Sequence, residues 1–418
     1  MAPSDTKSQK PFRIIIVGAG IVGLSLSHAL QLAGIDHVVL EKHHEIVSLR
    51  GAEYPVRSPG MRVAPLQRST RQVKIDTSSR VERIEHTKAD VSVHLADGSV
   101  EEGDMVIGAD GVHTRVRTLM WDYAAQYEPG GVSESDKEVM TSQFQAIFSV
   151  STQEEKFDLG PADSHVILGH DDAELLFTQP GKAYWAVIFK DEYKKPASRT
   201  KATEADIEAV AKKYANRPMT EKVALGDLWN TNTRHGLLTF EEGVLSKWHA
   251  GRLVLVGDSV HKMTADIGLG AHMAIESAFQ LCNILQRELK SNPNRHPSSS
   301  ELSAFSAEYQ AGRYERVTKI VDVCAKATRM HTYQTYSDRF FAGYVAPYLA
   351  SVRAIKFAEI MAHAPKLDYA PTRMTKENAK DWKLAQKREE NSSWMLYGVL
   401  TLGMGMALTY LVRVGLLL

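Results

Sequence analysis

The stretch "FRIIIVGAGIVGLSLSHALQLAG", from Phe12 to Gly34, decides the fold class. Its apolar run ends in glycines, which is typical of a strand buried on both faces of a parallel sheet. The residues after the glycines follow a helical period up to Gly34, and "HVVLEK" (His37–Lys42) predicts a second strand. The order strand, helix, strand therefore predicts an α/β domain with a parallel sheet.

The turn after the first predicted strand carries the pattern Gly-x-Gly-x-x-Gly at Gly18, Gly20 and Gly23. In such a turn the first glycine permits the tight bend, the second lets the backbone approach a pyrophosphate, and the third lets the helix pack on the strand. Glu41 ends the second strand, where an acid binds the ribose of adenosine. This loop alone suits NAD and FAD equally.

Two later stretches resemble further loops of this kind. The segment "GADGVHTRVR" (Gly108–Arg117) places Asp110 and Gly111 at the end of a predicted strand. The segment "GDSVHKMTADIGLG" (Gly257–Gly270) has a Gly-Asp after a strand and a Gly-x-Gly at the start of a helix. An isolated Asp-Gly is only a turn signal. The combination raises the question of whether the chain binds two nucleotides or one long cofactor.

Taken together, the three loops resemble those of flavoprotein monooxygenases of the p-hydroxybenzoate hydroxylase type. That resemblance implies a single FAD, held at its adenylate end by the first loop and at its flavin end by the third. It places Asp110 and Gly111 between FAD and NAD(P)H, and Asp258 on the ribityl chain. It also brings backbone close to the cofactor at Gly268, Gly270 and Ala271.

A narrower resemblance comes from "EEGVLSKWHAGRLVLVGDSVHKMT" and "YVAPYL". These segments are similar to fungal FAD-dependent monooxygenases of meroterpenoid and indole-diterpene biosynthesis, the epoxidase group. The resemblance implies an enzyme that uses NADPH or NADH and O2 to epoxidise an alkene of a small apolar prenylated substrate through a flavin C4a-hydroperoxide. An aromatic hydroxylase of the same superfamily remains an alternative. This chemistry requires no protein nucleophile and no metal, and we assign no catalytic residue from the sequence.

Strand-like runs between Thr141 and Lys190 predict a mainly antiparallel substrate sheet inserted into the FAD-binding domain. Tyr184, Trp185 and Phe189 are candidate pocket residues, with core packing as the alternative. The expected domains are the FAD-binding domain in two parts (12–125 and 241–295), the substrate sheet (140–240), a helical region (296–390) and a transmembrane helix (394–414).

The chain departs from the family in two regions. It is shortened between Glu41 and Asp110, where Ala52 and Arg68 resemble residues that contact FAD. In the third loop, Ala265-Asp266 and Leu269 replace the usual Pro-Asn and Gln, which we expect to weaken flavin positioning. A truncated, catalytically impaired flavoprotein is therefore a second hypothesis.

The composition excludes some classes of function. Lys+Arg and Asp+Glu both number 50, and this balance argues against a nucleic-acid-binding protein. Cys282 and Cys324 lack metal-ligand spacing, so we predict ordinary buried thiols and no metal site. His261 and His272 flank the third loop, and we expect structural hydrogen bonds there rather than contacts with the flavin.

The C-terminal segment has the composition of a membrane anchor. From Trp394 to Val412 there are 19 residues without a charge, which as a helix would span about 28 Å. Basic residues precede the segment, and this bias predicts a single-pass anchor in membrane lipid, of the endoplasmic reticulum, with a cytosolic catalytic domain. A terminal helix buried on the protein's own surface is the alternative.

Overall fold

The computed structural model describes residues 10–46, 73–87, 90–128, 130–197, 202–290, 292, 294–349, 360 and 363–370. The predicted cofactor residues Ala52 and Arg68 and the predicted anchor 394–414 lie outside these ranges. The described residues up to Ala342, together with Lys366–Ala370, belong to one unit, and the elements that follow lie in it unless stated otherwise. Among the described residues, no helix is long and apolar enough to cross a membrane.

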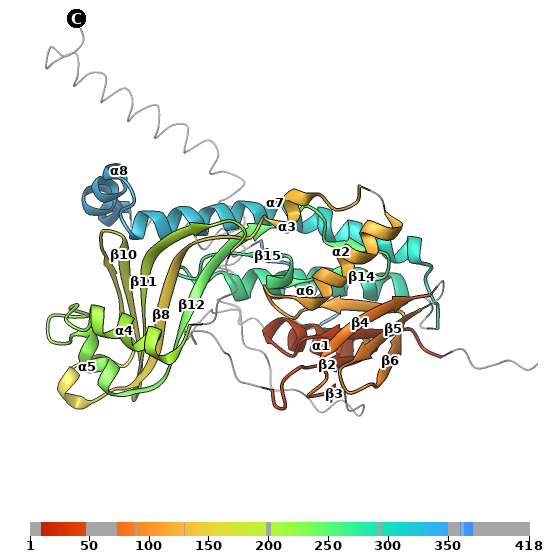
Figure 1. Ribbon diagram of the computed structural model, residues 1–418, viewed down its shortest axis with the longest axis horizontal. Coiled ribbons are helices and arrows are strands. Elements are labelled where there is room, and N and C mark those ends of the chain that lie inside the picture. Colours follow the sequence, from red (N-terminus) through yellow and green to blue (C-terminus); the bar gives the residue numbers. More distant parts are fainter. Residues whose placement is uncertain are drawn as a thin grey trace, which may run out of the picture. The chain divides into compact units, whose positions relative to one another are not determined.

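The first sheet has six strands in the order β13-β14-β7-β1-β2-β3. Figure 1 labels β14, β2 and β3 of this sheet. All its neighbours pair in parallel except β13 with β14. Ile14, Ile15 and Ile16 are fully buried, which explains the continuous apolar run of the opening stretch. The strands are β1 (Arg13–Val17), β2 (Asp36–Leu40), β3 (Lys74–Asp76), β7 (Met105–Gly108), β13 (His249–Ala250) and β14 (Leu253–Leu255).

Helices and a small sheet pack around this parallel sheet. Helix α1 (Ile21–Ala33) connects β1 to β2 and ends at Gly34 in the left-handed conformation. It packs against α6 (Gly270–Lys290), which in turn packs against α7 (Ser299–His331). Helix α2 (Arg115–Tyr127) follows β7. The small antiparallel sheet consists of β4 (Val81–His86), β5 (Val91–Leu95) and β6 (Val100–Gly103).

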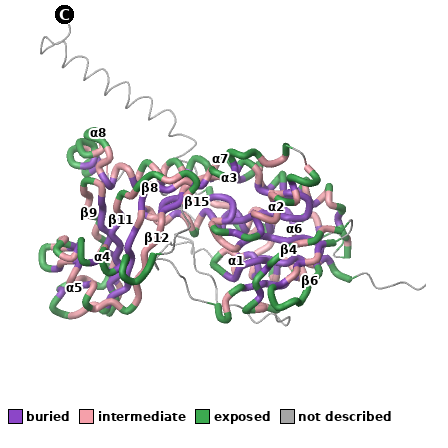
Figure 2. The backbone as a smooth tube through the Cα atoms, viewed as in Figure 1, coloured by how far each residue is buried: buried purple, intermediate pink, exposed green. Residues whose placement is uncertain are grey.

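The second large sheet is antiparallel, in the order β15-β12-β8-β11-β10-β9. This arrangement confirms the expected α/β fold with an antiparallel substrate sheet. Buried residues run along both large sheets (Figure 2). The strands are β8 (Thr141–Thr152), β9 (Ser164–Leu168), β10 (Asp172–Gln179), β11 (Lys182–Lys194), β12 (Asn232–Val244) and β15 (His261–Lys262).

Short helices complete the described chain. Helices α4 (Glu204–Tyr214) and α5 (Leu225–Asn230) cover one face of the second sheet. The remaining short elements are α3 (Glu134–Lys137), η1 (Glu155–Phe157), η2 (Gly257–Ser259), α8 (Tyr336–Phe340), η3 (Phe341–Val345) and η4 (Ala346–Leu349). Of these, η4 and the part of η3 from Gly343 onward belong to the second unit.

Beneath α4, strand β10 carries a buried acidic pair. Glu174 is 1% exposed, and the Arg217 guanidinium lies 3.0 Å from its Oε1 and also pairs with Asp172. Burial raises the pKa of Glu174 to about 7, against the opposing effect of Arg217. Because the ordinary pKa of glutamate in an unfolded chain is lower, the folded state is favoured when Glu174 is protonated.

This pair predicts a pH dependence of stability. Protonated Glu174 contributes fully to the free energy of unfolding at low pH, and this contribution is lost as the pH rises through about 7. Glu174→Gln keeps the site neutral, so its free energy of unfolding should fall less than that of the wild type between about pH 5 and about pH 8, by on the order of 2 kcal/mol. Urea unfolding at several pH values measures this difference, and parallel pH profiles for the two proteins would contradict it.

Candidate cofactor site

The three loops predicted from the sequence meet at the carboxyl ends of β1, β7 and β14. Gly18 has a φ of +105°, and a Cβ on it would lie 2.5 Å from the carbonyl oxygen of Ala109 in the second loop. A Cβ on Gly257 of the third loop would lie 2.9 Å from Cγ2 of Val22, on the helix that follows the first loop. Backbone approach this close is possible only because glycines occupy these positions.

Hydrogen bonds join the second loop to the third. The Ser259 hydroxyl donates to the carbonyl oxygen of Gly108 at 2.7 Å. The Arg117 guanidinium donates to the carbonyl oxygens of Ser259 at 3.1 Å and Val112 at 2.7 Å. Arg117 and Ser259 are both buried, so these bonds fix the two loops relative to each other. Sequence reasoning missed Ser259, because nothing local marks a serine as a partner of a strand about 150 residues earlier.

Glu41 connects the first loop to the end of β2. Its Oε2 accepts a hydrogen bond from the backbone N–H of Ala19 at 2.8 Å, and its Oε1 accepts one from that of His43 at 3.0 Å. The residue is 8% exposed. The carboxylate predicted to bind ribose therefore lies directly beside the glycine loop, as this type of site requires.

The glycines leave the space that a phosphate cofactor requires. No described heavy atom beyond the adjacent chain lies within 4 Å of a Cβ built on Gly20, Gly111 or Gly268, and at Gly270 the nearest is Met263 Cγ at 4.0 Å. Neither α1 nor α6 has an acidic residue in its first turn. Free N–H groups and the positive end of a helix dipole favour an anion there. The residues of the first and third loops therefore fit the pyrophosphate of FAD.

Asp110 has one carboxylate oxygen satisfied and one orphaned. Its Oδ2 accepts hydrogen bonds from the backbone N–H groups of Arg115 at 2.7 Å and Val116 at 3.3 Å, and thereby caps α2. Its Oδ1 is buried and has no hydrogen-bond partner in the described part of the chain. Burial raises the pKa of this carboxyl group. An unsatisfied buried oxygen fits contact with a polar group of a bound cofactor.

Asp258 forms an ion pair that the sequence analysis did not foresee. Its carboxylate binds the ammonium group of Lys262, which lies four residues further along the chain in β15. Burial opposes the charge on Lys262, but Asp258 raises its pKa overall. The charge of Glu241 on β12 raises the pKa of Lys262 further. The proposed ribityl ligand therefore has a cationic partner within the third loop itself.

At the end of the third loop, Gly268 has a φ of +70°, Gly270 is the first residue of α6, and Ala271 is exposed. Leu269, which replaces a polar residue of the family, is fully buried. Its side chain therefore contributes to the core beneath the loop. His261 is fully buried, with Nε2 3.0 Å from Oγ of Ser277, and burial lowers its pKa to about 3. This contact agrees with the structural role expected for His261.

The candidate pocket residues lie on opposite faces of the second sheet. Trp185 is 1% exposed and, with Phe189, packs in the core beneath α4 and α5. For these two residues the alternative of core packing therefore holds, because side chains alternate along a strand and both odd-numbered positions face the helices. By the same alternation, Tyr184 lies on the other face, beside Ala186 and Ile188.

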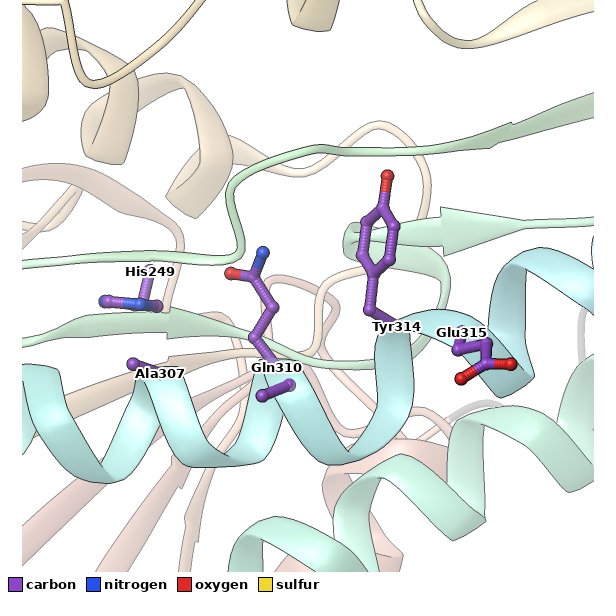
Figure 3. A pocket seen from close by; sticks show the side chains of 6 residues that line it. His249, Ala307, Gln310, Tyr314 and Glu315 are labelled. Carbon is purple, nitrogen blue, oxygen red and sulfur yellow. The ribbon is translucent and has the colours of Figure 1, made fainter.

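A hollow of about 480 Å³ lies beside α7. Figure 3 shows Gln310 and Tyr314 of α7 next to His249 of β13. None of the predicted cofactor residues lines it. This hollow is therefore distinct from the site formed by the loops.

Comparison with known proteins agrees with this geometry. The FAD binding domain family matches residues 12–58 and 62–308. The FAD-dependent monooxygenase DEP2 of Fusarium langsethiae is 32% identical over 86% of this chain and 80% of that protein. The FAD-dependent monooxygenase ausM of Penicillium brasilianum is 28% identical over 89% of this chain and 90% of that protein. The FAD-dependent monooxygenase atmM of Aspergillus flavus is 29% identical over 86% of this chain and 87% of that protein.

Solved structures share the fold at lower identity. Klebsiella pneumoniae HpxO complexed with FAD and uric acid matches with a TM-score of 0.55 and 18% identity, over 85% of this chain and 94% of that one. A salicylate hydroxylase substrate complex matches with a TM-score of 0.56 and 17% identity, over 86% of this chain and 100% of that one. These likenesses concern the fold alone.

The ion pair at the third loop generates a prediction about cofactor retention. Asp258→Ala removes the carboxylate expected on the ribityl chain and leaves Lys262 without its partner. We expect the dissociation constant of FAD to rise at least about tenfold, the scale of one charged hydrogen bond. Visible absorption of the protein after gel filtration measures the flavin retained.

Asp322→Ala is the matched control, because Asp322 forms the same Asp–Lys pair at four-residue spacing on the exposed surface of α7. It should retain flavin like the wild type. Equal flavin content in the Asp258 and Asp322 variants would refute the assignment of Asp258.

Proposed function

We propose that this protein epoxidises an alkene of a prenylated terpenoid intermediate in fungal secondary metabolism. The chain belongs to the FAD binding domain family and is an FAD-dependent monooxygenase. NADPH or NADH would supply the electrons and O2 the oxygen atom. The similarity to fungal monooxygenases over most of the chain supports the reaction class. The apolar face of the substrate sheet supports the class of substrate.

That face is the observation on which the proposal rests. Buried apolar side chains from four adjacent strands form one cluster, and Ala265 of the third loop packs against it. The cluster thus extends from the sheet to the loop that leads into α6. Its buried members are Phe144, Ala146, Phe148, Leu175, Ala186, Ile188 and Phe240, with Phe177 and Leu238 half-buried beside them.

The apolar side chains of this cluster suit an alkene. Beside them, the Arg329 guanidinium, which pairs with Glu242, lies 5.6 Å from the centre of the Phe144 ring. Hydroxylation of a phenol is assisted by a base that removes the phenolic proton, whereas an alkene needs only orientation and exclusion of water. An apolar wall supplies both requirements for an isoprenoid chain.

The residues of the three loops have distinct roles in this reaction. Gly18, Gly20 and Glu41 would hold the adenylate end of FAD, and Asp258 and the start of α6 the flavin end. FAD, when bound and reduced, activates O2 for transfer of one oxygen atom. The protein orients the alkene and keeps water from the reacting atoms.

The proposed reaction predicts a labelled product. With NADPH, 18O2 and a prenylated aromatic or polyketide substrate, the product should gain one 18O atom as an oxirane, and mass spectrometry after acid hydrolysis to the diol would locate it. Label in a phenolic hydroxyl would instead identify an aromatic hydroxylase. FAD retention without substrate-dependent NADPH oxidation for any prenylated substrate would favour the impaired flavoprotein.

Two neighbouring leucines of β12 provide a matched control. Leu238 packs with the apolar cluster, and Leu237 packs with the core beneath α4 and α5. Leu238→Gln should raise KM for the substrate about tenfold, because its amide group would then contact the isoprenoid chain of the substrate. FAD retention should stay as in the wild type. Leu237→Gln should lower stability with KM unchanged. Equal KM effects of the two variants would contradict the placement of the substrate.

We also propose that the segment from Trp394 to Val412 anchors the enzyme in a membrane with the catalytic domain in the cytosol. Its uncharged length and the preceding basic residues support this proposal. A chain that ends before Trp394 should move from the membrane pellet to the soluble fraction in cell fractionation and keep its FAD. If the shortened chain remains in the pellet after a high-salt wash, the anchor lies elsewhere.

A further inference from the structure

The third loop is joined to the last turns of α7 by a buried carboxylate. The Asp266 side chain has no exposed surface, and its Oδ2 lies 3.1 Å from Nδ1 of His331. The Thr328 hydroxyl lies 2.7 Å from Asp266 Oδ1 and 2.8 Å from the hydroxyl of Thr264. Two residues of the loop are thus bound by two residues of the helix. The groups Thr264, Asp266, Thr328 and His331 are called the α7 clamp below.

The clamp acts on a short segment next to the proposed cofactor site. Only Ile267 separates Asp266 from Gly268, and α6 begins at Gly270. The backbone N–H of Gly268 donates to the carbonyl oxygen of Ala265 at 3.0 Å, so the loop turns tightly between them. Leu269 is fully buried directly after this turn. A shift of Asp266 would therefore displace the first turn of α6.

The same end of α7 also holds the substrate sheet. The backbone N–H groups of Gly169 and Asp171, in the turn between β9 and β10, donate to the carbonyl oxygens of His331 at 3.3 Å and Thr332 at 2.9 Å. The Gln334 amide donates to Asp171 Oδ1 at 3.0 Å. One helix end thus fixes the position of both the third loop and the outer turn of the substrate sheet.

The chemistry of Asp266 explains why it needs these partners. A buried carboxylate is costly unless hydrogen-bond partners compensate it. The hydroxyl of Thr328 and the imidazole of His331 supply such contacts. The family resemblance led us to expect that Asp266, in place of Asn, would weaken the positioning of the flavin. In the structure this carboxylate binds α7.

We propose that Asp266 and His331 are positioning residues that hold the third loop on α7 and thereby set the affinity and the reduction potential of the bound FAD. The link to FAD rests on the proposed placement of the cofactor against Gly268 and Gly270. The start of α6 would stabilise negative charge on the reduced cofactor through its helix dipole. A loosened loop would weaken that effect.

The test compares Asp266→Leu, Asp266→Asn and His331→Leu. Asp266→Leu and His331→Leu should each raise the dissociation constant of FAD roughly tenfold and make its midpoint potential more negative. The double variant should bind FAD no more weakly than whichever of the two single Leu variants has the lower FAD affinity, because the two residues act through one contact. Asp266→Asn should restore most of the affinity, since its amide can still accept from Thr328 and donate to unprotonated Nδ1 of His331.

Glu242→Gln is the control, because Glu242 pairs with Arg329 on the same turn of α7 but binds no residue of the third loop. It should leave FAD affinity and potential unchanged. Hydrogen exchange of residues 264–270 in the cofactor-free protein reports on the clamp separately from the cofactor. Faster exchange in Asp266→Leu together with weaker FAD binding supports the proposal. Faster exchange with wild-type affinity and potential overturns it, as does unchanged exchange.

Discussion

The site depends on the contact between three backbone segments at the ends of β1, β7 and β14. A Cβ on Gly23 would lie 1.8 Å from the carbonyl oxygen of Gly18, and one on Gly18 would lie 2.5 Å from that of Ala109. No side chain fits between these segments, so helix α1 and the second loop both pack directly against the backbone of the first loop. The free N–H groups, the orphaned oxygen of Asp110 and the carboxylate of Glu41 are thereby brought to one place. The cofactor site is a consequence of this packing.

Much of this arrangement is predictable from local sequence. The apolar run before Gly18 and the helical period after it follow from burial on both faces of a parallel sheet and on one face of a helix. The hairpin of β5 and β6 follows from alternation and an Asp-Gly turn. Such features depend on neighbours in the chain, and local pattern is therefore sufficient to identify them.

Other features depend on partners far away in the chain. Nothing near Asp266 indicates His331 as its partner, and nothing near Gly108 indicates Ser259 as its partner. The face on which Trp185 lies depends on which side α4 covers, and alternation alone gives two equivalent choices. The pairing of Asp258 with Lys262 is local in the chain, but the segment between them is not an α-helix, so the spacing of four residues does not predict it.

Helix α7 has 33 residues, which corresponds to a rod of about 50 Å. Near its middle, Arg313 forms a buried ion pair with Glu276 of α6, and at its end His331 binds the third loop. An α-helix advances about 100° for each residue, so a single insertion or deletion between these two points would turn His331 away from Asp266 while leaving Arg313 in place. The number of residues between the two contacts is consequently constrained as tightly as their identity.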